Sequence, residues 1–422
     1  MKTIVESRFF SSLKMLSLTV LIAFPVLDFL LRQVIHIPII SSTWDDLLVM
    51  TLLLLTVPHL VREFPGRSLG RPILVFIVVF FALSFLDFSQ LGIGLEGFRA
   101  VAEYVVIFFA GACLVRNRRT ADMLLTLAVI IAAAVAIHGI YQYMAGIPMP
   151  GRWVDSAESL RTRAFSIVGS PNALGSYMAL MIPISLGQMM ASSNWFKRFG
   201  FLGAAGVMAI CLMVTFSRGA WLALAGSLAV IGIIYDRRLL YAGAVAAVLV
   251  LLFVPSVSHR ITYMFTDQYW MKSAENGRIG RWLNAYDQMR YDPLFGVGQG
   301  HYGGAVAQRH FGTTYVDNYY AKTAAETGLI GLGTLLWLLV TALRQALKAW
   351  RSVGDRRLQY AVLGLFAGCL AVAFHNAVEN IFEIPFLNLY FWFMMGLIFA
   401  LVQGSAHAIS NRKPSGGEAR AA

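Results

Sequence analysis

Charged residues are scarce in this chain of 422 residues: Asp, Glu, Lys and Arg together make up 13% of it, whereas they make up roughly a quarter of a soluble protein. Hydrophobic residues account for 58%. This composition excludes an ordinary soluble domain and makes membrane lipids the expected surroundings. The formal net charge of +12 does not predict nucleic-acid binding, because the basic residues stand mostly in short clusters between apolar runs, where they set membrane topology.

Cysteine is also rare. The three cysteines, Cys113, Cys211 and Cys369, all fall inside apolar stretches, and none belongs to a CxxC pair. This spacing excludes a disulfide framework and a cysteine-based metal site. The cysteines therefore indicate no metal site, and we expect no cofactor.

Long hydrophobic runs are abundant. A span needs about 20 mainly apolar residues to cross the hydrocarbon core, and this length predicts about twelve transmembrane helices in an all-α polytopic protein. The first run follows basic residues as a signal peptide does, but no small-residue cleavage site ends it, so we expect it to remain as a span. The expected spans lie near residues 13–31, 46–61, 71–88, 97–115, 122–144, 171–190, 199–216, 219–235, 239–255, 321–343, 358–378 and 384–404.

Alternate loops between these spans carry Lys and Arg, which predicts that they, and both termini, are cytoplasmic. The two long segments on the opposite side, at about 145–170 and 256–320, are the places with room for a folded site outside the bilayer. We expect residues 1–410 to form a single membrane domain and the polar residues 411–422 to form a disordered tail.

Two arginines stand beside expected span ends in the first half of the chain. Arg163 lies shortly before Pro171 and Asn172, which open a span, and a helix start with its free N–H groups favours an anion. The alternative, that Pro171 and Asn172 only end a loop, is equally open. Arg218 interrupts an apolar stretch in VTFSRGAWLAL, which favours a functional role over simple snorkelling to the interface.

The large external segment adds two more arginines. Arg278 and Arg281 are spaced i, i+3, so a helix would place both on one side. Two guanidinium groups there would suit a diphosphate, because each can bind phosphate oxygens through two N–H groups. The nearby GVGQG lacks the strand and helix context of a nucleotide-binding loop, and we interpret it as a tight turn.

Four further residues are candidate acids or bases. Asp317 precedes the tenth expected span, where it could act as a general base or merely cap the helix, and the spacing does not choose between these roles. His375 and Glu379 are spaced i, i+4 and could form a hydrogen-bonded pair, either as a proton relay or as a structural contact. His301, in the large external segment, is a weaker alternative base.

The order of these motifs resembles the bacterial O-antigen ligase and polymerase family, over most of the chain. The resemblance rests on FSRGAW at Phe216–Trp221, on GR-x-x-R-W followed by P-L-F-G-x-G, and on Asp317-Asn318 followed after nine residues by GLIG. Arg163 before SPNALGSY fits as well.

This resemblance implies a metal-independent glycosyltransferase in the bacterial cytoplasmic (inner) membrane, with its site facing the periplasm and an undecaprenyl-diphosphate-linked glycan as donor. Arg163, Arg218, Arg278 and Arg281 would bind the diphosphate, and a base would activate the acceptor hydroxyl. The implied acceptor is another glycan or lipid A-core, and a chain-length regulator is a possible partner. The ligase branch has His where this chain has Asp317, which favours a polymerase of O-antigen, capsule or exopolysaccharide over a ligase.

The main alternative from another class is a secondary transporter, since twelve spans with both ends inside describe many carriers. Carriers place their sites at the midplane, whereas the polar residues here lie in late external segments. A flippase of the same lipid-linked glycan would be expected to line an inner cavity with charge, and few charged residues fall in the middle of the expected spans.

Overall fold

The protein is described here by a computed structural model, which covers residues 8–35, 37–62, 67–149, 162–275 and 277–410. Every regular element in these ranges is a helix, and several of the helices are long and apolar enough to cross a bilayer. The prediction of an all-α, multi-pass membrane protein is therefore confirmed. The expected tail at 411–422 and residues 150–161 of the first external segment lie outside the described residues.

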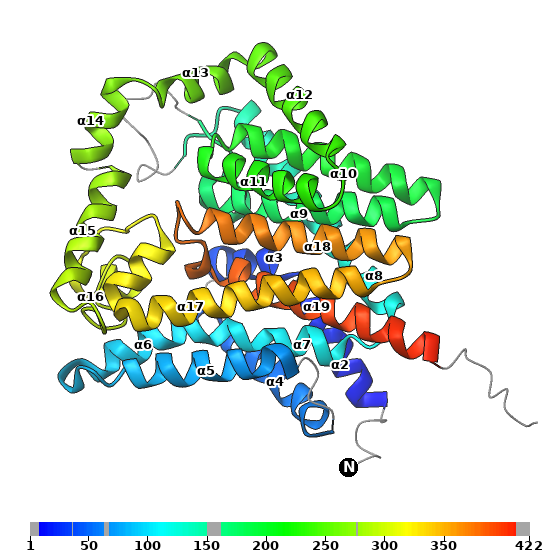
Figure 1. Ribbon diagram of the computed structural model, residues 1–422, viewed down its shortest axis with the longest axis horizontal. Helices are drawn as coiled ribbons and strands as arrows, with labels where there is room; N and C mark the ends of the chain where they lie inside the picture. The colour runs from blue at the N-terminus through cyan, green and yellow to red at the C-terminus, as the bar shows by residue number, and fades with distance from the viewer. Residues whose placement is uncertain (1–7, 36, 63–66, 150–161, 276, 411–422) are drawn as a thin grey trace, which may run out of the picture.

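The first half of the chain forms helices that run back and forth along one axis (Figure 1). The elements up to residue 168 are α2 (Arg8–Ile22), α3 (Phe24–Phe29), the π-helix η1 (Leu30–Ile35), α4 (Pro38–Arg62), α5 (Arg67–Leu83), η2 (Phe88–Gln90), α6 (Leu91–Ala102), η3 (Glu103–Val106), α7 (Ile107–Leu114), α8 (Arg118–Met144) and η5 (Ser166–Val168). They are followed by α9 (Pro171–Ala191), α10 (Trp195–Val214), α11 (Arg218–Ile234) and α12 (Arg238–Phe253).

The expected large external segment is itself helical. It contains α13 (Pro255–Tyr263), α14 (Asp267–Glu275), α15 (Arg278–Tyr291) and α16 (Ala305–Phe311). These four helices gather at one end of the long helices, on the left in Figure 1. The chain then returns through α17 (Tyr319–Ser352), α18 (Arg356–His375), η6 (Ile381–Glu383) and α19 (Pro385–Ser410).

The core is centred on α18 and α19, whose side chains are mostly buried. Small residues bring the backbones close together, as is common where helices pack within a membrane. A Cβ atom at Gly187 of α9 would lie 2.7 Å from the Tyr360 carbonyl oxygen and 2.9 Å from the Gly364 Cα of α18. Gly111 of α7 and Gly396 of α19 meet in the same way. This close packing makes a rigid base for the end of the bundle where α18 stops and α19 begins.

Each of the twelve expected spans falls on an apolar helix or on consecutive helices. Eight helices among the described residues have the length and composition of a span, and two bent pairs raise that number to ten. The bends are 72° between α2 and the helices after it, and 98° between α12 and α13. The remaining two expected spans correspond to shorter apolar helices, Leu69–Leu83 and Arg218–Ile234. The count of twelve and the cytoplasmic position of both termini thus stay predictions.

Helix α17 is broken at Gly328, which has φ 60° and ψ −162°. The break leaves backbone groups without partners inside the helix, and the segment 293–298 pairs with them. The Val297 N–H donates to the Ala325 carbonyl oxygen at 2.9 Å, and the Leu329 N–H donates to the Pro293 carbonyl oxygen at 2.8 Å. Unpaired backbone groups are very unfavourable in a membrane protein. The PLFGVG and GLIG segments are therefore coupled in this fold, because the first completes the backbone hydrogen bonds of the second.

We expect Gly328→Ala to destabilise the protein strongly. Its Cβ atom would lie 2.3 Å from the Leu294 carbonyl carbon, and the backbone conformation is one that only glycine adopts readily, at about 1–3 kcal/mol for other residues before the clash is counted. Gly333→Ala in the same helix is the matched control, since a Cβ atom there meets nothing within 4 Å. In detergent, the midpoint temperature of thermal unfolding should fall strongly for Gly328→Ala and stay near the wild-type value for Gly333→Ala. Equal midpoints for the two variants would contradict a special role of Gly328 at the helix break.

Candidate active site

A cavity of about 880 Å³ opens where α9, α11 and α15 begin. Its wall is rich in cations, with six basic side chains and three carboxylates. The basic residues are Arg163, Arg218, Arg260, Lys272, Arg278 and Arg281, and the acidic residues are Asp317, Glu379 and Glu383. Helix starts present free N–H groups and a positive dipole end, which add to the positive potential. The cavity is therefore suited to an anion with several oxygens.

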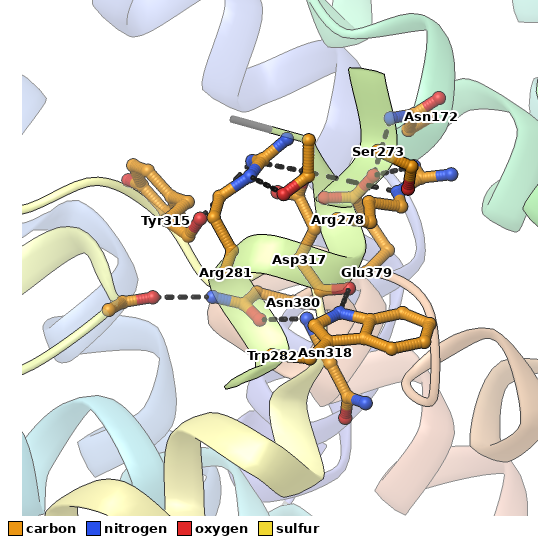
Figure 2. A network of polar contacts seen from close by, with 12 residues as sticks. Asn172, Ser273, Arg278, Arg281, Trp282, Tyr315, Asp317, Asn318, Glu379 and Asn380 are labelled. Atoms are coloured by element: carbon orange, nitrogen blue, oxygen red, sulfur yellow. Dashed lines mark hydrogen bonds and ion pairs between the residues drawn. The ribbon is translucent and has the colours of Figure 1, made fainter. Parts of the chain in front are cut away.

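Helix α15 supplies two of these cations from its first turn. It begins at Arg278 after Gly277, so the predicted i, i+3 spacing places Arg278 and Arg281 together on the cavity wall. Arg281 Nη1 lies 2.6 Å from Asp317 Oδ2 and donates to the Tyr315 carbonyl oxygen at 3.2 Å. Arg278 Nε lies 3.8 Å from the same Asp317 oxygen. Figure 2 shows the two guanidinium groups converging on this carboxylate.

Asp317 does not cap α17. The cap is Asn318, whose side-chain oxygen accepts from the Tyr320 and Ala321 N–H groups. Asp317 itself has a left-handed backbone with φ 53°, which is uncommon outside glycine, and its carbonyl oxygen accepts a hydrogen bond from Trp282 Nε1 at 3.3 Å. The capping alternative is therefore wrong, because this backbone turns the Asp317 carboxylate toward α15 and leaves the capping position to its neighbour.

Arg163 and Asn172 form a second part of the cavity wall. Arg163 is buried, and its Nε donates to the Thr215 carbonyl oxygen at 2.8 Å while its Nη2 donates to Asn172 Oδ1 at 3.1 Å. Helix α9 begins at Pro171 and is capped by Ser170. The amide of Asn172 then donates to Glu379 Oε2. Asn172 thus does more than end a loop, since it connects an arginine to a carboxylate across the cavity.

Arg218 is the first residue of α11, which has Ser217 as its N-cap position. Its guanidinium lies over the Tyr269 ring, 5.1 Å from the ring centre, and its Nη1 donates to the Arg260 carbonyl oxygen at 3.4 Å. Phe216, just before α11, has φ 50° and lies under the Arg260 guanidinium at 5.8 Å. These contacts place Arg218 at the cavity wall rather than at the lipid surface.

Sequence reasoning did not single out Arg260 and Lys272, which also line the cavity. Both lie in the segment between the ninth and tenth expected spans. Neither belongs to a recognisable motif, and basic residues in a long loop carry little topology information, so the sequence held no signal for them.

Two of the candidate bases, His301 and His375, do not line the cavity. The Nδ1 atom of His301 lies 2.8 Å from the Gln299 carbonyl oxygen, its Nε2 lies 3.1 Å from Gln90 Oε1, and its ring stacks on Phe311. These contacts give His301 a structural setting between η2 and α16.

The expected hydrogen-bonded pair of His375 and Glu379 does not form. Helix α18 ends at His375, so the i, i+4 spacing does not place the two side chains on one helical face. His375 is fully buried with no hydrogen-bond partner for either ring nitrogen in the described part of the chain, and it packs against Gly219 of α11. Glu379 faces the cavity without it.

Glu379 lies in the turn between α18 and η6, outside the expected spans. Its Oε2 accepts from Asn172 and lies 3.4 Å from Arg278 Nη2. Burial raises the pKa of Glu379, the neighbouring Asp317 carboxylate raises it further, and Arg278 lowers it in part, which leaves the pKa at about 7. Glu379 is therefore a carboxylate that can take up a proton near neutral pH.

Metal binding finds no support in the described ranges, where no three His, Cys, Asp or Glu side chains are grouped to hold an ion. The absence of a cofactor stays a prediction.

A search of curated proteins gave no match, whereas a family model described as O-antigen ligase matches residues 203–338. The match runs from α10 to the middle of α17 and includes Arg218, Arg278, Arg281 and Asp317. Arg163 and Glu379 lie outside it. The chain is thus similar to the O-antigen ligase family over this segment, which supports the resemblance to the O-antigen ligase and polymerase family without a choice between its two branches.

Proposed function

We propose that the protein is a glycosyltransferase of the bacterial inner membrane that uses an undecaprenyl-diphosphate-linked glycan as donor and polymerises repeat units at the periplasmic face. The observation that carries the proposal is the cavity in which α9, α11 and α15 bring Arg163, Arg218, Arg278 and Arg281 together. A diphosphate that leaves a sugar gains negative charge, and fixed cations stabilise that charge in the transition state. Such a reaction needs no metal ion or nucleotide, because the donor is already activated.

Two features of the site distinguish a polymerase from a ligase and from a carrier or flippase: the residue at position 317 and the place of the cavity. A carboxylate in place of the histidine of the ligase branch favours a polymerase, whereas a ligase would pass the completed glycan to lipid A-core. A carrier or flippase would be expected to hold its substrate near the middle of the bilayer, but the cationic cavity here is built from helix starts and from α13–α16 at one end of the bundle.

Deletion of the gene in its own host, with plasmid complementation, tests the proposal. Surface glycans and lipid-linked intermediates are separated on gels. We expect long chains to be lost while single repeat units remain, and the plasmid to restore the long chains. Long chains that accumulate on the lipid carrier without reaching their final acceptor would instead mean a ligase. An unchanged set of glycans and intermediates would contradict both.

A further inference from the structure

Asp317 and Glu379 both line the cavity, but their carboxylates have different partners. Asp317 is bound by arginine: Arg281 lies 2.6 Å from its Oδ2, and Arg278 lies 3.8 Å from the same oxygen. Arginine stays charged at all physiological pH values and gives up no proton. The Oδ2 atom of Asp317 is therefore already occupied by these guanidinium groups, and the contacts fix the positions of both arginines.

Glu379 is held mainly by a neutral group. Asn172 donates to its Oε2, and Arg278 is more distant, at 3.4 Å. The side chain is 10% exposed, against 18% for Asp317, and it still lines the cavity. Burial disfavours the charged form of a carboxylate, and one neutral donor with a more distant cation offsets that effect only in part.

The groups around Glu379 come from four segments. They are Asn172 of α9, Arg163 from the segment before η5, which contacts Asn172, Arg278 of α15, and Asp317 before α17. Burial and Asp317 raise the pKa of Glu379 to about 7 despite Arg278. A group with this pKa is half ionised at neutral pH, which matches the requirement for a general base.

We infer that Glu379 is the general base of the transfer reaction and that Asp317 is a positioning residue that holds Arg278 and Arg281 in place. This inference rests on the proposed function. The acceptor hydroxyl oxygen forms the new bond to the anomeric carbon, and its proton passes to a Glu379 oxygen. The bond from the anomeric carbon to the diphosphate oxygen breaks, and the electron pair leaves with the polyprenyl diphosphate, whose added charge the arginines stabilise. Glu379 later returns its proton to water.

Glu379→Gln tests the inference, since glutamine can still accept a hydrogen bond from Asn172 but cannot take up a proton. Purified full-length variants in lipid vesicles receive a polyprenyl-diphosphate glycan, and kcat and KM are measured across pH. The wild-type kcat should rise with pH through about 7. Glu379→Gln should lower kcat by about 100-fold or more and abolish this pH dependence. Asp317→Asn should lower activity only about 10-fold and keep the pH dependence.

Two further variants serve as a control and as a conservative substitution. Asp287→Asn, on the exposed part of α15, should behave as wild type. Glu379→Asp should retain part of kcat and the acidic limb of the pH profile, which shows that the position tolerates a change without unfolding. A Glu379→Gln enzyme near the wild-type rate, or an Asp317→Asn enzyme that loses the acidic limb, would overturn the inference. Inactive wild-type protein would instead count against the proposed function, before any variant is compared.

Discussion

Arg278→Ala and Arg281→Ala should each abolish detectable glycan transfer, with a fall of about 10³-fold for either variant. Both guanidinium groups line the cavity from the first turn of α15 and are about three-quarters buried. Removal of one positioned donor to a developing anion lowers kcat by about 10²–10³-fold. Alanine at position 281 also leaves the Asp317 carboxylate without its 2.6 Å partner, so that its charge opposes the arriving diphosphate.

Glycan transfer is measured in lipid vesicles. Membrane fractionation checks that the variants still insert into the membrane, as we expect. Arg290→Ala is the matched control on the same helix: this side chain is 60% exposed and contacts Asp287, at 3.3 Å, and the Tyr291 ring, both in its own helix. Arg281→Lys should recover only part of the activity, since lysine keeps the charge but loses the two-pronged geometry. Normal transfer by both alanine variants would refute the idea that these residues hold the diphosphate.

The sequence predicted those features that depend on local pattern. Hydropathy located the membrane helices, since a span of apolar residues is recognisable in any context. The i, i+3 spacing of Arg278 and Arg281 was sufficient to place them on one side of α15, whose start coincides with the first of them. The two glycine-containing motifs were visible as a pattern, but their pairing across the break in α17 required the fold.

Contacts between residues far apart in the chain could not be predicted from the sequence. Asn172 and Glu379 are separated by 207 positions, and no linear pattern records which amide meets which carboxylate. The choice between Asp317 and Asn318 as helix cap depends on a backbone turn with φ 53°, which composition does not specify. His375 and Glu379 were paired by assuming that α18 continues, whereas it ends at His375 and the next residues turn toward the cavity.

The cavity also depends on a buried ionic cluster that no sequence motif indicated. Lys322 of α17 is 4% exposed, and its Nζ lies 2.9 Å from Glu326 Oε2 and 2.8 Å from Glu383 Oε1. Glu383 lines the cavity and accepts a hydrogen bond from the Ala305 N–H at the start of α16. Glu326 accepts from the Tyr302 N–H. One lysine thus joins α17, η6 and the segment before α16.

Lys322→Met should therefore destabilise the protein by about 3–5 kcal/mol, because removal of one partner leaves uncompensated charge in a buried site. Thermal unfolding in detergent should show the loss as a midpoint several degrees lower. Lys348→Met, at an exposed position of the same helix, is the matched control and should unfold like wild type. Adding Glu326→Gln and Glu383→Gln to Lys322→Met should restore most of the stability, since the buried carboxylates are then neutral amides. A Lys322→Met midpoint equal to that of the control would show that the cluster does not stabilise this end of the bundle.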